Sequence, residues 1–132
     1  GDVWHLGSWQ PITGGAVPGV LPPGLWSGAA IAFVDRARYL QPKGGRVSRL
    51  TASAQTVVNP YEVVLVVCKN GTPTTLTVRV TNANYFAGVQ DLDPTHDVTF
   101  TNLDQIDIRA SNNVGAITDV IGLTATLVYN SN

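Results

Sequence analysis

Charge is scarce in this chain. Only 13% of its 132 residues are Asp, Glu, Lys or Arg, which is about half the share of a typical soluble domain. The formal net charge is −1, so the sequence carries no overall basic footprint for nucleic acid. The surface must therefore be covered by Thr, Ser, Asn, Gln and backbone, which leaves area available for packing against further copies of the chain.

Sulfur is scarcer still. The one cysteine, Cys68, excludes an intramolecular disulfide, and its apolar neighbours predict a small buried side chain rather than a reactive thiol. Methionine is absent, so Gly1 is either a processed end or the edge of a fragment, and we expect a fragment of a longer protein. No apolar stretch is long enough to span a bilayer, so we expect no membrane insertion.

Helical periodicity is also missing, and β-strand patterns take its place. Residues 61–69 are nearly continuously apolar, which predicts a strand buried on both faces. Asn70-Gly71 follows, and this dipeptide is the strongest short hairpin signal. Residues 74–81 then alternate, with Leu76, Val78 and Val80 on one face. The sequence therefore predicts a β-hairpin over 61–81.

Similar short segments recur along the rest of the chain. A turn is expected at Leu103-Asp104, outward-facing Asp107 and Arg109 in the strand after it, and a loop over 111–115. About seven such strands with turn residues between them predict an all-β antiparallel sandwich over residues 29–132. The further strands are expected near residues 29–38, 47–54, 98–100, 106–110 and 122–129.

Residues 1–28 differ in composition from the rest. They hold four of the eight prolines and all three tryptophans, Trp4, Trp9 and Trp26. Frequent Pro and Gly oppose helix and central strand, so we expect an extended arm whose aromatic side chains dock on this domain's own sheet or on a neighbouring subunit.

Five basic residues are close together in the sequence, namely Arg36, Arg38, Lys43, Arg46 and Arg49, whereas five acidic residues follow between positions 91 and 107. We interpret these charges as solvated strand faces, with pairing between neighbouring subunits as the alternative.

The cadence from residue 61 to 129 resembles a known family. It is carried by the segments VVLVVCKNGTPTTLTVRV, DVTFTNLDQIDIRAS and IGLTATLVY. They are similar to the C-terminal knob domains of bacteriophage fibre and head-decoration proteins, which resemble the jelly rolls of tumour necrosis factor and of complement globular heads. The family turn often reads Gly-Asp where this chain has Leu103-Asp104, and the resemblance does not cover the tryptophan-rich arm.

The resemblance implies a jelly-roll fold and a homotrimer in which inner sheets meet around a three-fold axis. The apolar strand over 61–68 would suit a place at that axis. The residues that we expect to serve assembly are Trp4, Trp9, Trp26, Tyr61, Val63 and Leu65.

Two loops carry candidate ligand groups. Aromatic rings stack on pyranose faces while amides and carboxylates bind sugar hydroxyls, so a glycan site is one interpretation of Asn82, Asn84, Tyr85, Phe86, Asn112 and Asn113. Closure of the core by Tyr85 and Phe86 is the alternative.

The acidic loop over 90–97 offers oxygen ligands for Ca²⁺ in Asp91, Asp93 and Asp97, although acidic residues are also common turn formers. No hydrolase or phosphate-binding motif is present. A small hydrolase using Asp91, Asp93 and His96 is a third hypothesis, which would require activity to be lost on their mutation.

Taken together, the sequence predicts a non-enzymatic, extracellular virion component without a cofactor. It would be the trimeric knob of a fibre or a capsid-decoration protein, with the rest of a fibre or capsid as partner and a host surface glycan as candidate ligand. The alternative is a carbohydrate-binding module of a secreted enzyme or adhesin.

Overall fold

The computed structural model describes residues 2–8, 19–20, 39–40, 43–57, 62–112, 120–121 and 123–131, with side chains at 43–57, 62–110 and 123–130. This part of the chain is almost entirely β-strand, and every strand pair is antiparallel. The all-β prediction is therefore confirmed. No helix in the described residues is long and apolar enough to cross a membrane.

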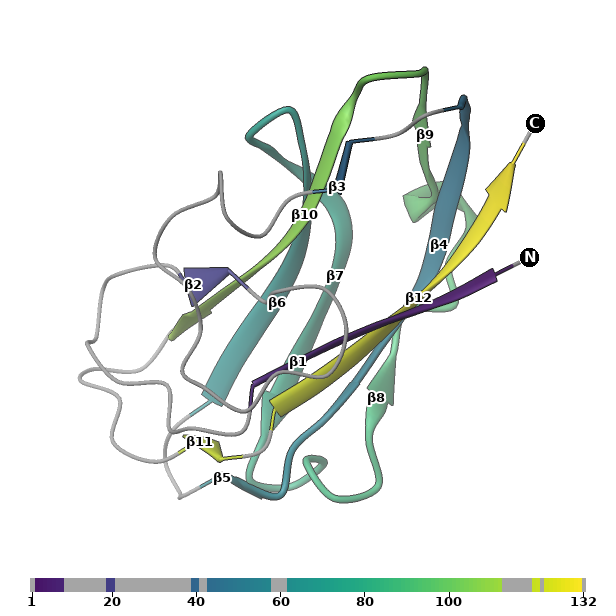
Figure 1. Ribbon diagram of the computed structural model, residues 1–132. Helices are drawn as coiled ribbons and strands as arrows, with labels where there is room; N and C mark the ends of the chain where they lie inside the picture. Colours follow the sequence, from purple (N-terminus) through teal and green to yellow (C-terminus); the bar gives the residue numbers. More distant parts are fainter. Residues whose placement is uncertain are drawn as a thin grey trace.

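The first sheet has the order β1-β12-β4-β8, with β9 also pairing β4. Figure 1 shows it as one of two layers, in which β1, β12 and β4 run side by side. Its strands are β1 (Asp2–Ser8), β4 (Gly45–Ser53), β8 (Val89–Gln90), β9 (Val98–Phe100) and β12 (Leu123–Ser131).

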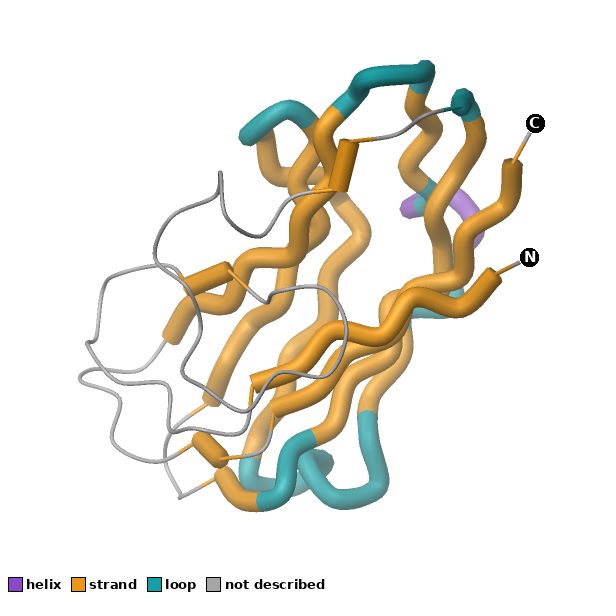
Figure 2. The backbone as a smooth tube through the Cα atoms, in the orientation of Figure 1, coloured by secondary structure: helices purple, strands orange, loops and turns teal. Residues whose placement is uncertain are grey.

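The second sheet has the order β2-β10-β6-β7, with β3 also pairing β10. Its strands are β2 (Gly19–Val20), β3 (Tyr39–Leu40), β6 (Glu62–Lys69), β7 (Thr72–Thr81) and β10 (Gln105–Asn112). A two-stranded sheet joins β5 (Thr56–Val57) to β11 (Val120–Ile121). A 3-10 turn, η2 (Pro94–His96), precedes β9 and is drawn in purple in Figure 2.

One hydrophobic core lies between the two large sheets. β6, β7, β10 and β12 turn alternate side chains toward it, as the alternation of apolar residues predicts. The positions expected to share one face of β7, Leu76, Val78 and Val80, all lie in this core. The largest fully buried side chains are Leu50, Leu65, Leu76, Ile106, Ile108, Leu123, Leu127 and Val47.

The predicted hairpin is confirmed. β6 pairs with β7 on either side of Asn70-Gly71, and both turn residues have positive φ, 51° and 81°. A two-residue turn with this left-handed backbone matches the right-handed twist of the flanking strands. Leu103, at the other predicted turn, also has a positive φ of 68°.

Burial differs from expectation on the second sheet. Strand β6 alternates rather than being buried on both faces: Val63 and Leu65 are in the core, whereas Val64 and Val66 are half-buried. Asp107, expected to face solvent, is fully buried. A strand's period of two assigns residues to faces, but it does not reveal which outer positions are covered.

Two pieces of the N-terminal segment pair with the sheets. Asp2–Ser8 is an edge strand, paired along its length with β12, and Gly19–Val20 pairs with β10. An edge position is compatible with the Pro- and Gly-rich chain that follows. Trp4 lies in β1, whereas Trp9, Trp26, Tyr61 and the whole strand expected at 29–38 lie outside the described residues.

Candidate functional site

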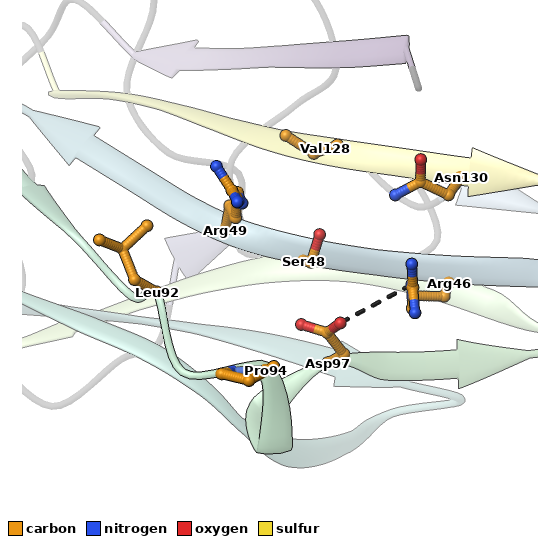
Figure 3. A pocket seen from close by; sticks show the side chains of 8 residues that line it. All are labelled: Arg46, Ser48, Arg49, Leu92, Pro94, Asp97, Val128 and Asn130. Carbon is orange, nitrogen blue, oxygen red and sulfur yellow. Dashed lines mark ion pairs between the residues drawn. The ribbon is translucent and has the colours of Figure 1, made fainter.

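A cavity of about 490 Å³ opens on the first sheet. Figure 3 shows two of its residues, Arg46 and Arg49, on β4, with Ser48 between them. β12 borders it on one side, and the segment that contains η2 borders it on the other (Figure 3). Its lining residues are Arg46, Ser48, Arg49, Leu92, Pro94, Asp97, Val128 and Asn130.

An irregularity in β4 brings the two arginines to the same cavity. In a regular strand, residues 46 and 49 would point to opposite faces. The pairing of β4 with β12 shifts register between Thr126 and Val128, and Arg49 has a φ of 54°. An extra residue of this kind in one strand reverses the facing of the residues beyond it. As a result, Leu50 returns to the core while Arg49 lines the cavity.

The two arginines differ in their partners. Arg46 Nε lies 3.7 Å from Asp97 Oδ2, a long ion pair between partly exposed groups. Within the described part of the chain, no hydrogen bond or ion pair engages the Arg49 side chain. The cavity therefore holds two guanidinium groups against one carboxylate.

Sequence reasoning placed these arginines in a basic cluster but interpreted them as solvated strand faces. Their spacing of three residues was the available signal, because two strand residues three apart reach the same face only when a bulge lies between them. Alternation alone did not reveal that bulge, because Arg-Val-Ser-Arg-Leu also fits a regular strand.

The acidic loop folds around internal hydrogen bonds. Asp91 Oδ2 accepts from the Thr77 backbone N–H at 3.3 Å and is joined to His96 Nδ1 at 2.8 Å, while Oδ1 accepts from the Asp93 N–H at 3.1 Å. Asp93 caps η2, since its Oδ1 accepts from the backbone N–H and the hydroxyl of Thr95.

These contacts set the titration of the loop. The hydrogen bond to Asp91 raises the pKa of His96, although desolvation opposes it. Burial alone would raise the pKa of Asp91, but hydrogen bonds from His96, Asp93 and Thr77 outweigh burial and lower it. Hydrogen bonds from Thr95 lower the pKa of Asp93.

The predicted metal ligands serve other contacts here. Asp91 and Asp93 organise the loop, whereas Asp97 faces Arg46. Among the described residues, no group of three or more His, Cys, Asp or Glu side chains could hold a metal ion. The three carboxylates are thus close in sequence without forming a common coordination site.

The predicted glycan residues are only partly brought together. Asn82 Nδ2 donates to the Val57 carbonyl at 2.7 Å. Asn84 uses both ends of its amide locally, since Oδ1 accepts from the Thr81 N–H and Nδ2 donates to the Arg79 carbonyl. Asn112 ends strand β10, opposite Val63, instead of lying in a loop, and Asn113 is outside the described residues.

The two aromatic residues of this turn behave differently. Tyr85 is half-buried and packs against the core, as the core-closure alternative predicts. Phe86 is 86% exposed, and its ring meets Tyr85 edge-on, with centroids 6.5 Å apart. One exposed ring therefore remains available for stacking on a ligand.

A buried acid lies on the second sheet. Asp107 Oδ1 accepts from Arg109 Nε at 3.1 Å, whereas Oδ2 is buried and has no hydrogen-bond partner among the described residues. Desolvation raises the pKa of Asp107, with Arg109 opposing. Across the strand pair lies Cys68, which is free and fully buried as predicted. Burial, together with the charge of Asp107, raises the thiol pKa to about 11.

No protein-family model matches the chain. No curated protein matches it either.

Proposed function

We propose that the chain is a non-enzymatic assembly and attachment domain of a virion, a jelly-roll knob or decoration domain that forms a homotrimer. The observation that carries the proposal is the order of strand pairing. β1 pairs β12, β2 and β3 pair β10, β4 pairs β8 and β9, and β6 pairs β7. When β2 and β3 are counted as one interrupted strand and β8 and β9 as another, each strand outside the small sheet pairs with its counterpart counted from the other end. The pairings β12–β4 and β10–β6 then join these pairs into the two sheets.

Such nested pairing is what a rolled-up antiparallel hairpin produces, and it is the pattern of a double-sheet jelly roll. It supports the fold that the family resemblance implies. The shortage of charge supports assembly, because charged residues are depleted in the cores of protein interfaces.

The contact surface has to differ from the one first expected. Val63 and Leu65 lie in this chain's own core, so their side chains are not available to a neighbour. The half-buried Val64 and Val66 lie on the opposite face of the same strand. We place the contact between subunits on this outer face of β6.

The mass in solution tests this proposal. Light scattering should give three times the 14.0 kDa of the chain over a range of concentrations. Val66→Lys should reduce the mass to that of the monomer, because a lysine at the interface core is strongly disfavoured. Gln55→Lys, a matched change at an exposed position, should leave the trimer intact. A monomeric natural chain would overturn the proposal.

A carbohydrate-binding module is the second candidate, and the exposed ring of Phe86 is the observation that favours it. Exposed aromatic rings stack on the apolar faces of pyranoses. Phe86→Ala should then abolish binding to a neutral polysaccharide, whereas Leu103→Ala, at another exposed apolar loop residue, should not. A monomer with this pattern would favour the module over the knob.

A further inference from the structure

The cavity beside β4 has the size of a small-molecule site, and its lining is mainly polar. Ligand pockets are typically about 300–1,000 Å³ and combine apolar walls with a few convergent polar groups. Leu92, Pro94 and Val128 supply apolar surface here, and Leu92 is 62% exposed. Ser48 and Asn130 add a hydroxyl and an amide at the same cavity.

The charge of the cavity selects the sign of the ligand. Asp97 lies 3.7 Å from Arg46 in a long ion pair, so one positive charge of the lining has no carboxylate partner among the described residues. Arg49 is the residue whose guanidinium group no described partner engages. A planar guanidinium presents paired N–H donors that match a carboxylate in a bidentate arrangement.

The backbone conformation of Arg49 also indicates a ligand site. Its φ of 54° lies in the left-handed region, which favours glycine over residues with a side chain. Non-glycine residues in this region are concentrated at ligand sites, where their cost is offset by function. Arg49 therefore combines a strained backbone with a guanidinium group that no described residue engages.

We propose that this cavity binds a saccharide that carries a carboxylate, with Arg49 holding the carboxylate. Leu92, Pro94 and Val128 contact the C–H face of the sugar, and Asn130 and Ser48 bind its hydroxyl groups. The choice of a saccharide rests on the attachment role proposed above, whereas the requirement for an anion rests on the two arginines alone.

Calorimetry with four monosaccharides of similar size tests the ligand class. N-acetylneuraminic acid and glucuronic acid should bind, and galactose should not. N-acetylglucosamine 6-sulfate tests whether the site prefers a carboxylate, because a guanidinium group can also bind two oxygens of a tetrahedral anion. Equal binding of galactose, preference for the sulfate, or no binding at millimolar concentration would each overturn the proposal.

Four variants test the residues. Arg49→Gln should weaken binding of the acidic sugar by about tenfold or more, as expected for loss of a charge-assisted hydrogen bond. Arg49→Lys keeps the charge but loses the fork, so its affinity should be intermediate. Asp97→Asn should strengthen binding, because it removes the carboxylate that competes for Arg46.

Lys43→Gln is the matched control, since it removes one exposed positive charge outside the cavity lining. An equal loss of affinity in Lys43→Gln and Arg49→Gln would mean attraction to net charge only, and would overturn the site. Light scattering on the same samples separates the two proposals. A monomer that binds the acidic sugar refutes the trimer alone, whereas a trimer that does not bind refutes the cavity alone.

Discussion

At the scale of single residues, two positions have features that lower the stability of the fold. Arg49 has a backbone conformation that suits glycine, and Asp107 has a buried oxygen without a hydrogen-bond partner among the described residues. Each costs stability in general terms. Both are therefore positions at which a substitution should stabilise the protein, and this can be measured without knowing any ligand.

Replacing Arg49 with glycine should increase stability. Glycine adopts positive φ readily, so the change should add about 1 kcal/mol to the free energy of unfolding in urea. Arg46→Gly, three residues earlier in the same strand, should instead lower stability by about 0.5–1 kcal/mol, because glycine weakens regular strand. A lower urea midpoint for Arg49→Gly would show that its side chain contributes more to the fold than its backbone costs.

Replacing Asp107 with asparagine should change how stability depends on pH. Burial raises the folded-state pKa of Asp107 above its usual 3.8. Its contribution to stability is therefore fully present below pH 3.8 and is lost as the pH rises through the raised pKa. Asp107→Asn should remove this decline and should be more stable than the natural chain at pH 7. Parallel stability curves for the two proteins across this range would contradict the prediction.

At the scale of elements, the turns at one end of the second sheet hold each other. The Asn70 side chain donates to Asp104 Oδ1 and accepts from the Gln105 N–H, each at 2.9 Å, and the Asn70 N–H donates to the Gln105 carbonyl at 2.8 Å. One asparagine thus links the β6–β7 turn with the turn that begins β10. The hydrogen bond from Asn70 is also the largest cause of the lowered pKa of Asp104.

Asn70→Ala should destabilise the protein by about 2 kcal/mol, because two side-chain hydrogen bonds and the tolerance for positive φ are lost together. Asn70→Gly keeps the backbone conformation and loses only the side-chain bonds, so it should cost about half as much. Thermal unfolding of the two variants separates these contributions. Equal melting temperatures for the two variants would rule out a separate backbone contribution.

The sequence predicts these elements unevenly, for physical reasons. The Asn70-Gly71 hairpin and the core positions of β7 and β12 follow from local turn chemistry and alternation. The bulge at Arg49 and the burial of Asp107 do not follow from these local patterns. Each depends on how other segments of the chain pack against the strand. The cavity is likewise formed by three segments that are distant in sequence, and a pattern within one segment cannot reveal it.

At the scale of the whole molecule, the first sheet is completed by the first strand of the chain. β1 pairs with β12 along seven residues and occupies the edge next to it. Removing residues 1–8 would turn β12 into an edge with unpaired backbone groups, and such edges pair readily with other chains.

We therefore expect deletion of residues 1–8 to lower the free energy of unfolding by several kcal/mol, as expected for losing a row of backbone hydrogen bonds. The truncated chain should also form aggregates larger than the natural assembly, which chromatography with light scattering would detect. Deleting Asn132 alone is a control for shortening the chain. Unchanged stability and mass after the eight-residue deletion would mean that β1 contributes little.

The pairing of β1 with β12 also fixes an order of events during synthesis. Asp2 pairs with Tyr129 and Ser8 with Leu123, so β1 is made more than a hundred residues before β12 and cannot pair until β12 has been made. Contacts between distant segments form slowly, and strands without partners are vulnerable in the meantime. Few charges are present to keep copies of this chain apart. We therefore expect association between nascent copies to be easiest before β12 has been made.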